Sequence, residues 1–289
     1  MTERLYGVAD VGGTYRRVEV WNDGMELVGQ ANGTVHPEDY EGTVRSIADS
    51  ILQIADGNGE LVAVGTAVAS EIGEQGRLVL GGALSPWSGK RFGVDIGAAV
   101  GLPQERSGTL NDMTAAAVSQ LAVNQGRGIH ESGYVSTLSS GWGGKPYRRD
   151  GEVGYDSPGH AFLRDGAECP CGGHDHTEAF LSGKGVELNH GVQMKDWLSD
   201  RRNARQFVTD LSIATITLVE RNRDEGFPID VMRWMGGVAT GQPVLMARAE
   251  AAVRDKLGNG APLWEAVSFG GQAGLHGAFV EARRLAEVA

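Results

Sequence analysis

Cysteine is nearly absent from this chain, which has two cysteines among 289 residues, Cys169 and Cys171. Two cysteines one residue apart cannot form a disulfide framework, so we expect a protein of a reducing compartment, the cytoplasm. The N-terminal segment MTERLYGVADVGG has no basic-then-apolar leader, in agreement with that expectation. No apolar run approaches about 18 residues, so we expect no membrane-spanning helix and no membrane partner.

Positive charge is also scarce. Lys and Arg number 26 against 37 for Asp and Glu, which gives a formal net charge of -11. Such a field repels nucleic-acid phosphates, so we expect no nucleic-acid partner. Any anionic ligand must be held by local geometry against this overall field.

Two common nucleotide-binding signatures are missing. The chain has no G-x-x-x-x-G-K-[ST] segment, which argues against a P-loop, and no G-x-G-x-x-G after its first expected strand, which argues against a dinucleotide-binding fold. Glycine itself is abundant, with 44 residues, and it gathers in turns next to expected strands. These turns are the candidate phosphate-binding elements.

Apolar patterning predicts an α/β protein. Strands are expected at 5–10, 16–21, 25–30, 61–68, 107–110, 133–139, 231–237 and 263–269, with one more after the turn at 140–144. Helices are expected at 39–55, 94–100, 114–123, 204–224 and 242–257 and at the end of the chain. The chain looks like two α/β halves, each opening on a strand, a glycine turn and a strand. No Pro- or Ser-rich linker separates them, so we expect them to pack closely with a cleft between.

The opening turns of the two halves have the composition of phosphate-binding turns. In the first, Asp10 ends a strand and Gly12, Gly13 and Thr14 follow; in the second, Gly141, Gly143 and Gly144 surround Trp142. Backbone N–H groups of such turns can wrap phosphate oxygens, and Asp10 can hold a magnesium ion through water. A single Gly-Gly turn is more often plain hairpin chemistry. Two turns at matching places favour the phosphate interpretation.

Two further positions have both a structural and a functional interpretation. Gly236 and Gly237 join a strand to a helix, where the backbone could lie against a nucleotide base or could form a simple turn. Asn111 and Asp112 stand where another strand meets a helix. Asp112 is there either a helix N-cap or a general base that takes the proton of a substrate hydroxyl.

A metal site is predicted between residues 157 and 178. His160, Cys169, Cys171 and His176 supply the two sulfur and two nitrogen ligands that tetrahedral zinc prefers. The alternative is a chance neighbourhood of two cysteines and some surface histidines. A closed shell of four ligands leaves no position for water, so such a zinc would brace a loop and perform no chemistry.

Taken together, these segments resemble the ROK family, sugar kinases with repressor relatives in the actin-like ATPase superfold. The resemblance rests on DVGGTYRR, NDMTAAA, SSGWGG, the GH-to-CPCG loop, GGVA and AGLHGA, in the family's order from Asp10 to Gly277. It implies a duplicated two-lobe α/β fold with an interlobe cleft and a zinc-braced loop. The lobes would be residues 1–110 and 111–289, the last helix being able to pack back on the first lobe.

The resemblance also implies roles for residues. Asp10, Gly12, Gly13 and Thr14 match the first phosphate motif, Gly141, Gly143 and Gly144 the second, and Gly236 with Gly237 the adenosine motif. Asp112 matches the catalytic base. Asn111 and Glu178 match sugar ligands, and His160 matches a histidine that binds zinc through one ring nitrogen and a sugar hydroxyl through the other.

Three positions depart from the family pattern. His176 replaces the usual third cysteine, which zinc accepts readily. Ser157 stands where the family commonly has a sugar-binding Glu, and Ala83 where it has a sugar-binding Asn. Because missing partners leave substrate hydroxyls unpaired, either the sugar is not ordinary glucose or neighbours such as Ser85 or Asp156 compensate.

The resulting expectation is an ATP-dependent kinase for a hexose hydroxyl, glucokinase-like or acting on an N-acetylhexosamine or another hexose. Its ligands would be ATP, Mg²⁺, a structural Zn²⁺ and a small-molecule sugar, and family resemblance suggests a homodimer. One alternative is a non-catalytic sugar sensor or regulator without a DNA-binding domain. A second is an activator or acyl-phosphate kinase on the same superfold, against which the cysteine loop argues.

Overall fold

The computed structural model describes residues 2–79 and 82–288, which form two compact units. The first unit holds residues up to Ala122 together with Gln272 onward, and the second holds Val123–Gly271. The expected lobes divided the chain at residue 110, with the last helix able to pack back on the first lobe, so the segments to place are residues 111–122 and that helix. Both of these lie in the first unit because α3 (Asp112–Gly126) starts directly after β5 (Ser107–Asn111) and its Ala115 packs against Gly277 of α10 (Ala273–Val288).

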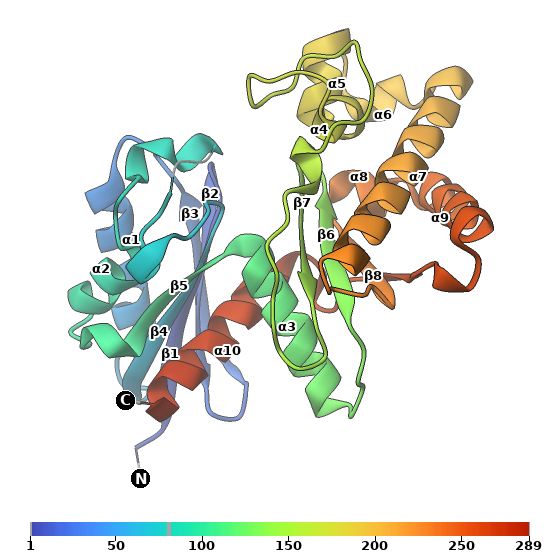
Figure 1. The fold of residues 1–289 in the computed structure, drawn as a ribbon. Coiled ribbons are helices and arrows are strands. Elements are labelled where there is room, and N and C mark those ends of the chain that lie inside the picture. Colours follow the sequence, from blue (N-terminus) through green and yellow to red (C-terminus); the bar gives the residue numbers. More distant parts are fainter. Residues whose placement is uncertain (1, 80–81, 289) are drawn as a thin grey trace. The chain divides into compact units, whose positions relative to one another are not determined.

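The first unit is a five-stranded sheet with helices on both faces (Figure 1). The strand order is β3-β2-β1-β4-β5, in which β1–β2 and β2–β3 are antiparallel while β1–β4 and β4–β5 are parallel. Besides β5, the strands are β1 (Arg4–Val11), β2 (Tyr15–Asn22), β3 (Leu27–Thr34) and β4 (Glu60–Val68), and two helices of this unit are α1 (Tyr40–Ala55) and α2 (Phe92–Ala99).

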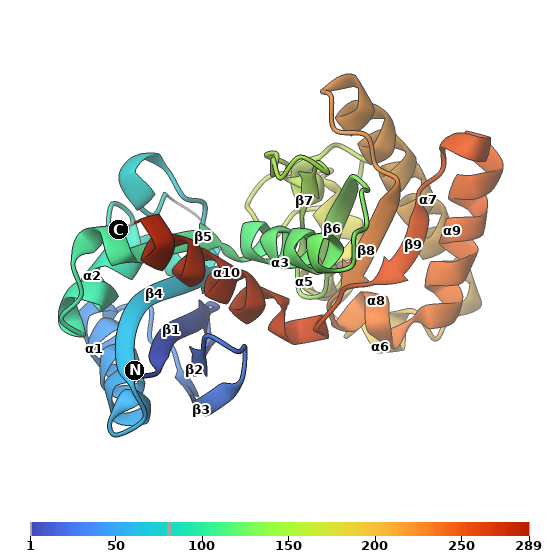
Figure 2. The ribbon, with the colours of Figure 1, turned by 90° about the horizontal axis from the view of Figure 1, so that it is seen from below.

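The period-two alternation of β1 divides its side chains between two cores. Leu5 and Val11 pack with α1 and α2, whereas Tyr6 and Val8 pack with α10. The approach of α10 to the sheet is close because Gly65 of β4 has no side chain: a Cβ there would lie 2.0 Å from the Ala278 carbonyl oxygen. Figure 2 shows α10 running along β4.

The second unit, like the first, begins with two consecutive strands that pair in antiparallel fashion. Its sheet has the order β7-β6-β8-β9, with β6–β7 antiparallel and β6–β8 and β8–β9 parallel. The strands are β6 (Gly133–Leu138), β7 (Trp142–Tyr147), β8 (Val231–Met235) and β9 (Leu263–Ala266). The helices are α4 (Thr177–Leu181), α5 (Gly183–His190), α6 (Met194–Trp197), α7 (Arg201–Asp224), α8 (Gly237–Gly241) and α9 (Pro243–Leu257). Helices α7 and α9 pack together in the main core of this unit (Figure 2).

The expected α/β class and the expected strands and long helices are confirmed, with ends that differ by a few residues. Helices α4, α5, α6 and α8 were not predicted. In the part of the chain that the structure describes, no helix combines the length and the apolar character needed to cross a membrane.

Candidate active site

The first glycine turn follows β1, whose register places Asp10 opposite Arg17 of β2. Gly12 N–H donates to the Tyr15 carbonyl oxygen at 3.0 Å, which closes the turn, and Thr14 is exposed. Arg17 Nη2 lies 3.4 Å from Asp10 Oδ2, and the Asp10 side chain is 19% exposed. Burial raises the pKa of Asp10, and the charge of Arg17 opposes that rise. The turn therefore places glycine backbone next to the Asp10 carboxylate, which is paired with the Arg17 guanidinium. Arg17 was not among the residues predicted from the sequence.

Asn111 and Asp112 occupy the junction of β5 and α3. Asn111 Oδ1 accepts the N–H groups of Met113 at 3.0 Å and Thr114 at 3.1 Å, so Asn111 forms the cap of α3. Its amide nitrogen donates to the Ser70 carbonyl at 3.1 Å. Asp112 Oδ1 also accepts the Met113 N–H, at 2.8 Å. Asn111 therefore makes the two capping contacts at the start of α3, in the position directly before Asp112.

The second glycine turn joins β6 to β7 and lies against Glu178. Trp142 N–H donates to Glu178 Oε2 at 3.2 Å, and a Cβ at Gly141 would lie 3.2 Å from the same oxygen. A Cβ at Gly159 would lie 2.8 Å from it. The Glu178 carboxylate thus contacts both the second glycine turn and the loop that carries His160, which brings together two separately predicted motifs within this unit.

Two more glycines are required where segments of the second unit meet. Gly144 faces the ring of Tyr134, which a Cβ would approach to 2.3 Å. Gly236 has φ 93 and ψ 151 and lies against the end of β6, where a Cβ would be 2.6 Å from the Leu138 carbonyl oxygen. A Cβ on the next residue, Gly237, would meet no atom within 4 Å. The predicted adenosine turn therefore lies beside the second glycine turn and has an open side at Gly237. Gly143, the remaining member of the second turn, pairs with Thr137 in the β6–β7 ladder.

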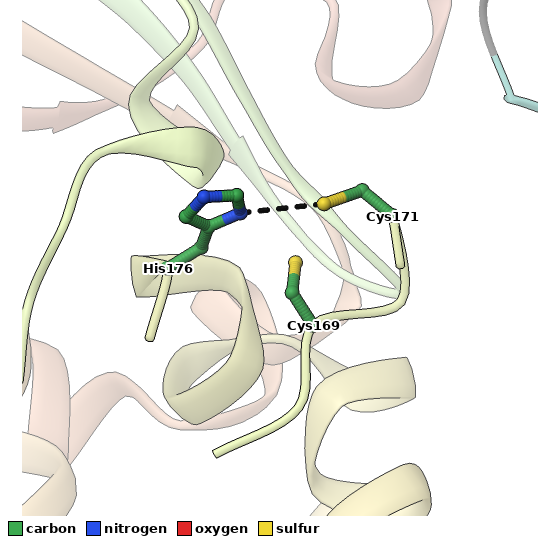
Figure 3. Close-up of side chains that lie close together, drawn as sticks. All are labelled: Cys169, Cys171 and His176. Atoms are coloured by element: carbon green, nitrogen blue, oxygen red, sulfur yellow. Dashed lines mark hydrogen bonds between the residues drawn. The ribbon is translucent and has the colours of Figure 1, made fainter. Parts of the chain in front are cut away.

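Three of the four predicted metal ligands converge (Figure 3). The ligand atoms of Cys169, Cys171 and His176 all lie within 4.8 Å of one another, and Cys171 Sγ is 3.3 Å from His176 Nδ1. Ligands of one tetrahedral zinc are about 3.5–3.8 Å apart, so this set fits a single ion. Burial raises the pKa of the Cys169 thiol to about 11, a cost that a bound cation would offset.

The fourth predicted ligand, His160, lies beside this group but outside it. Its ring centroid is 5.6 Å from that of His176, and its Nδ1 is 3.2 Å from Ser157 Oγ. Its role as a ligand stays a prediction. Ala83 lies in a 3-10 segment at Gly82–Trp87, but its side chain is outside the part of the chain that the structure describes.

Comparison with known proteins agrees with this architecture. No curated protein matches the chain significantly. A ROK hexokinase from Thermus thermophilus superposes with a TM-score of 0.76 at 23% identity, covering 97% of this chain and 99% of that one. A ROK family glucokinase from Streptomyces griseus, solved with glucose and AMPPNP, gives 0.71 at 22% identity over 98% and 99%. A ROK family transcriptional regulator, a homolog of the E. coli MLC protein, gives 0.77 at 16% identity over 98% and 79%.

At these identities the superpositions establish a common fold. The family model described as "ROK family" matches residues 6–207, most of the chain, and includes both glycine turns and the cysteine loop. The chain belongs to the ROK family.

Proposed function

We propose that this protein is an ATP-dependent sugar kinase that transfers a phosphoryl group to a hexose hydroxyl, with Asp112 as the general base. The observation that carries the proposal is the start of α3, where Asn111 makes the cap and the next residue is an aspartate that the cap does not require. A carboxylate at that position suits a base that takes a hydroxyl proton as the phosphoryl group is transferred.

The phosphate side of the reaction would use the glycine turns. In the first turn, the backbone after Asp10 and the Thr14 hydroxyl would donate hydrogen bonds to phosphate oxygens, while Arg17 adds positive charge beside them. In the second unit, the turn at Gly141 and the open backbone at Gly237 would hold the rest of the nucleotide. Magnesium, when bound with ATP, supplies further neutralisation of phosphate charge, and Asp10 is the residue that would hold it.

The sugar side would use His160, Glu178, Asn111 and Ser157. Asn111 accepts two backbone N–H groups and donates to Ser70, so its remaining amide hydrogen is the group it can offer to a hydroxyl. Glu178 is fixed by the Trp142 N–H and would accept a hydroxyl hydrogen. Zinc on Cys169, Cys171 and His176 would brace the loop that carries His160.

The test is a phosphorylation assay with Mg-ATP and a panel of hexoses that includes glucose, mannose, N-acetylglucosamine and N-acetylmannosamine. We expect sugar-dependent ADP release for at least one of them, and a loss of about 10²- to 10⁴-fold in kcat for Asp112→Asn. The matched control is Asp39→Asn, the same substitution at the cap of α1, where asparagine caps equally well and activity should not change.

Two results would contradict the proposal at different levels. A folded, zinc-loaded protein that releases no ADP with any hexose would exclude the kinase and leave the regulator alternative. Sugar-dependent activity that Asp112→Asn lowers by less than about tenfold would retain the kinase and exclude Asp112 as its base.

A further inference from the structure

A groove with a volume of about 580 Å³ lies in the first unit between α1, α2 and the segment that runs from Arg77 to Arg91. The two helices lie side by side on one face of the sheet (Figure 1). All of the described residues that line the groove lie outside the candidate active site. Pockets for small molecules have volumes of roughly 300–1,000 Å³, so the groove has the size of a ligand site.

The groove is basic although the chain as a whole is acidic, with a net charge of -11. Four cationic side chains and two carboxylates line it, those of Arg45, Arg77, Lys90 and Arg91 and those of Glu41 and Asp95. The surplus is therefore two positive charges. Like charges around one hollow repel each other unless an anion lies between them, so this balance points to an anionic ligand.

Both carboxylates of the groove already have a donor. Glu41 Oε1 lies 3.3 Å from Lys90 Nζ, and Asp95 Oδ2 accepts the Tyr40 hydroxyl at 2.5 Å. Burial and the hydrogen bond to Asp95 raise the pKa of Tyr40, so this hydroxyl stays protonated and Asp95 is held by a neutral donor. The two carboxylates therefore leave the three arginines of the groove without a counter-charge.

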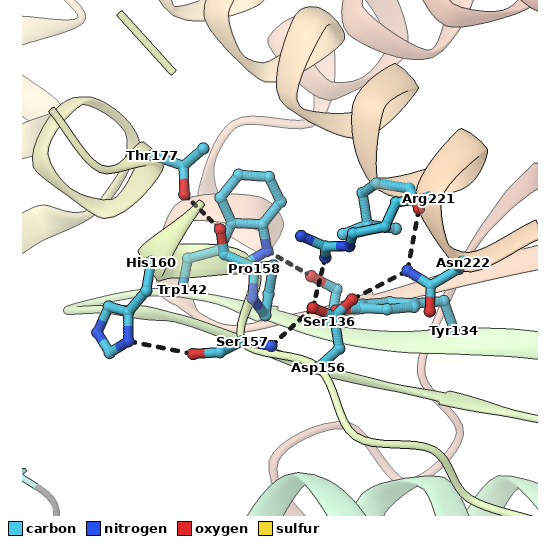
Figure 4. A network of polar contacts seen from close by, with 11 residues as sticks. Tyr134, Ser136, Trp142, Asp156, Ser157, Pro158, His160, Thr177, Arg221 and Asn222 are labelled. Atoms are coloured by element: carbon cyan, nitrogen blue, oxygen red, sulfur yellow. Dashed lines mark hydrogen bonds and ion pairs between the residues drawn. The ribbon is translucent and has the colours of Figure 1, made fainter. Parts of the chain in front are cut away.

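An arginine of the second unit shows the usual alternative. Arg221 Nη2 lies 2.5 Å from Oδ1 of Asp156, whose other oxygen accepts the Tyr134 hydroxyl and the Asn222 amide (Figure 4). In the part of the chain that the structure describes, none of the three groove arginines forms an ion pair with a carboxylate. The positive charge of the groove is thus uncompensated by the protein.

Two of the guanidinium groups are nevertheless fixed in place, by neutral acceptors. Arg77 Nη1 donates to the Gly89 carbonyl oxygen at 2.7 Å. Arg91 Nε donates to the Gln75 carbonyl oxygen at 3.2 Å, and its Nη1 donates to Gln104 Oε1 at 3.1 Å. These contacts use Nη1 and Nε and leave Nη2 of each group for a ligand. A guanidinium group that is held before binding loses little freedom when it contacts an anion.

We propose that this groove is a binding site for a small phosphorylated polyol, the class to which sugar phosphates belong. A phosphate monoester carries about -1.5 to -2 charges near neutral pH and has three acceptor oxygens, which match the surplus of two positive charges and the planar donors of arginine. Glu41 and Asp95 each keep a second carboxylate oxygen that can accept a hydroxyl hydrogen. The site does not rest on the proposed function, although the product of that reaction belongs to the same class.

Methyl NMR signals test the site directly, because Val44, Ala98 and Ala99 line the groove. In methyl-labelled protein we expect glucose 6-phosphate to shift the signals of these residues and glucose at the same concentration to leave them unchanged. Inorganic phosphate is the third arm. Equal shifts with inorganic phosphate would overturn the polyol part of the assignment and leave a phosphate site, and no shift with either phosphate would overturn the whole proposal.

Variants test the arginines, with the dissociation constant taken from the same methyl shifts so that binding elsewhere on the protein does not enter it. Arg91→Gln and Arg45→Gln should each weaken the binding of glucose 6-phosphate about tenfold. Arg45 is exposed on α1, so its replacement keeps the test valid if Arg91→Gln does not fold. The matched control Arg254→Gln removes an exposed arginine of α9 and should bind as the wild type does. Wild-type binding in Arg45→Gln and in folded Arg91→Gln would overturn the proposal, whether or not the protein is a kinase.

Discussion

The pair Gly236 and Gly237 allows a sharp test of the predicted adenosine turn, because neighbouring glycines there should respond oppositely to alanine. Gly236 has φ 93 and ψ 151, a region that is essentially restricted to glycine. A Cβ on it would lie 2.6 Å from the Leu138 carbonyl oxygen and 2.8 Å from Thr137 Oγ1. The turn would have to move away from the end of β6 to accept a methyl group.

The expected loss of stability in Gly236→Ala has two contributions. Backbone strain in this region costs about 1–3 kcal/mol, and forcing a methyl group into a packed contact costs about 1–3 kcal/mol more. A total near 3 kcal/mol lowers the melting temperature of a unit of this size by roughly 6–12 °C. At Gly237 the methyl group enters open space at the first residue of α8, where alanine is a better helix former by up to about 1 kcal/mol. Gly237→Ala should therefore melt at the wild-type temperature or slightly above it.

Calorimetry of both variants, combined with ATP kinetics, checks the argument. We expect Gly236→Ala to melt earlier and to show an ATP KM raised about tenfold, because the displaced turn no longer matches the nucleotide. The sugar KM should change little. Equal melting temperatures for the two variants would refute the strain argument, and an unchanged ATP KM in a destabilised Gly236→Ala would refute the adenosine assignment.

Two further predictions concern metal and pH. Purified wild-type protein should contain about one zinc by elemental analysis, and Cys169→Ser should lose it and become sensitive to proteolysis between residues 160 and 178; less than half an equivalent in the wild type contradicts the site. Burial lowers the pKa of His276, whose ring meets Trp21 edge-on at 5.1 Å, so the folded state favours the neutral imidazole. Its contribution to stability is complete above the ordinary value of 6.5 and is lost as the pH falls from there towards the lowered folded value. His276→Gln should flatten the decline in melting temperature between pH 7.5 and 5.5, and a variant with the full wild-type slope would argue against this.

The elements that the sequence predicted well are those whose burial repeats with a regular period. In α1 the buried residues Val44, Ile47, Ile51 and Ala55 recur at helical spacing, and Asp39 caps the helix by accepting the Gly42 N–H. In β1 the side chains alternate between two cores, because both faces of the sheet are covered. The sequence pattern of such an element predicts its secondary structure without knowledge of what it packs against.

The short helices between residues 177 and 197 carry no such signal. Helix α4 has five residues and α6 has four, fewer than two turns, so no apolar period can develop. Their positions depend on tertiary contacts, such as the hydrogen bond that the Gly183 N–H at the start of α5 donates to the Ser139 carbonyl oxygen at 2.8 Å. A helix of this length is stabilised by its surroundings, which one sequence does not display.

The residues of the candidate site likewise differ in how well the sequence predicted their neighbours. The cysteines and His176 were predictable because three metal-type side chains fall within eight positions, and a loop that short can bring them to one ion. The pairing of Asp10 with Arg17 was also within reach, since a hairpin centred on the glycine turn places these two residues opposite each other. The register of the hairpin determines these cross-strand neighbours.

The burial and the partners of Asp156 could not be predicted from composition or spacing. Next to Ser157 in a loop, an aspartate has the sequence profile of an exposed ligand, and burial of a carboxylate is rare unless donors surround it. Those donors come from Tyr134, 22 residues earlier, and from Arg221 and Asn222, 65 and 66 residues later. Only the packing of α7 against β6 brings them together, so the direction in which the carboxylate points depends on the whole unit. The same packing makes position 157, beside it, the one whose side chain meets His160.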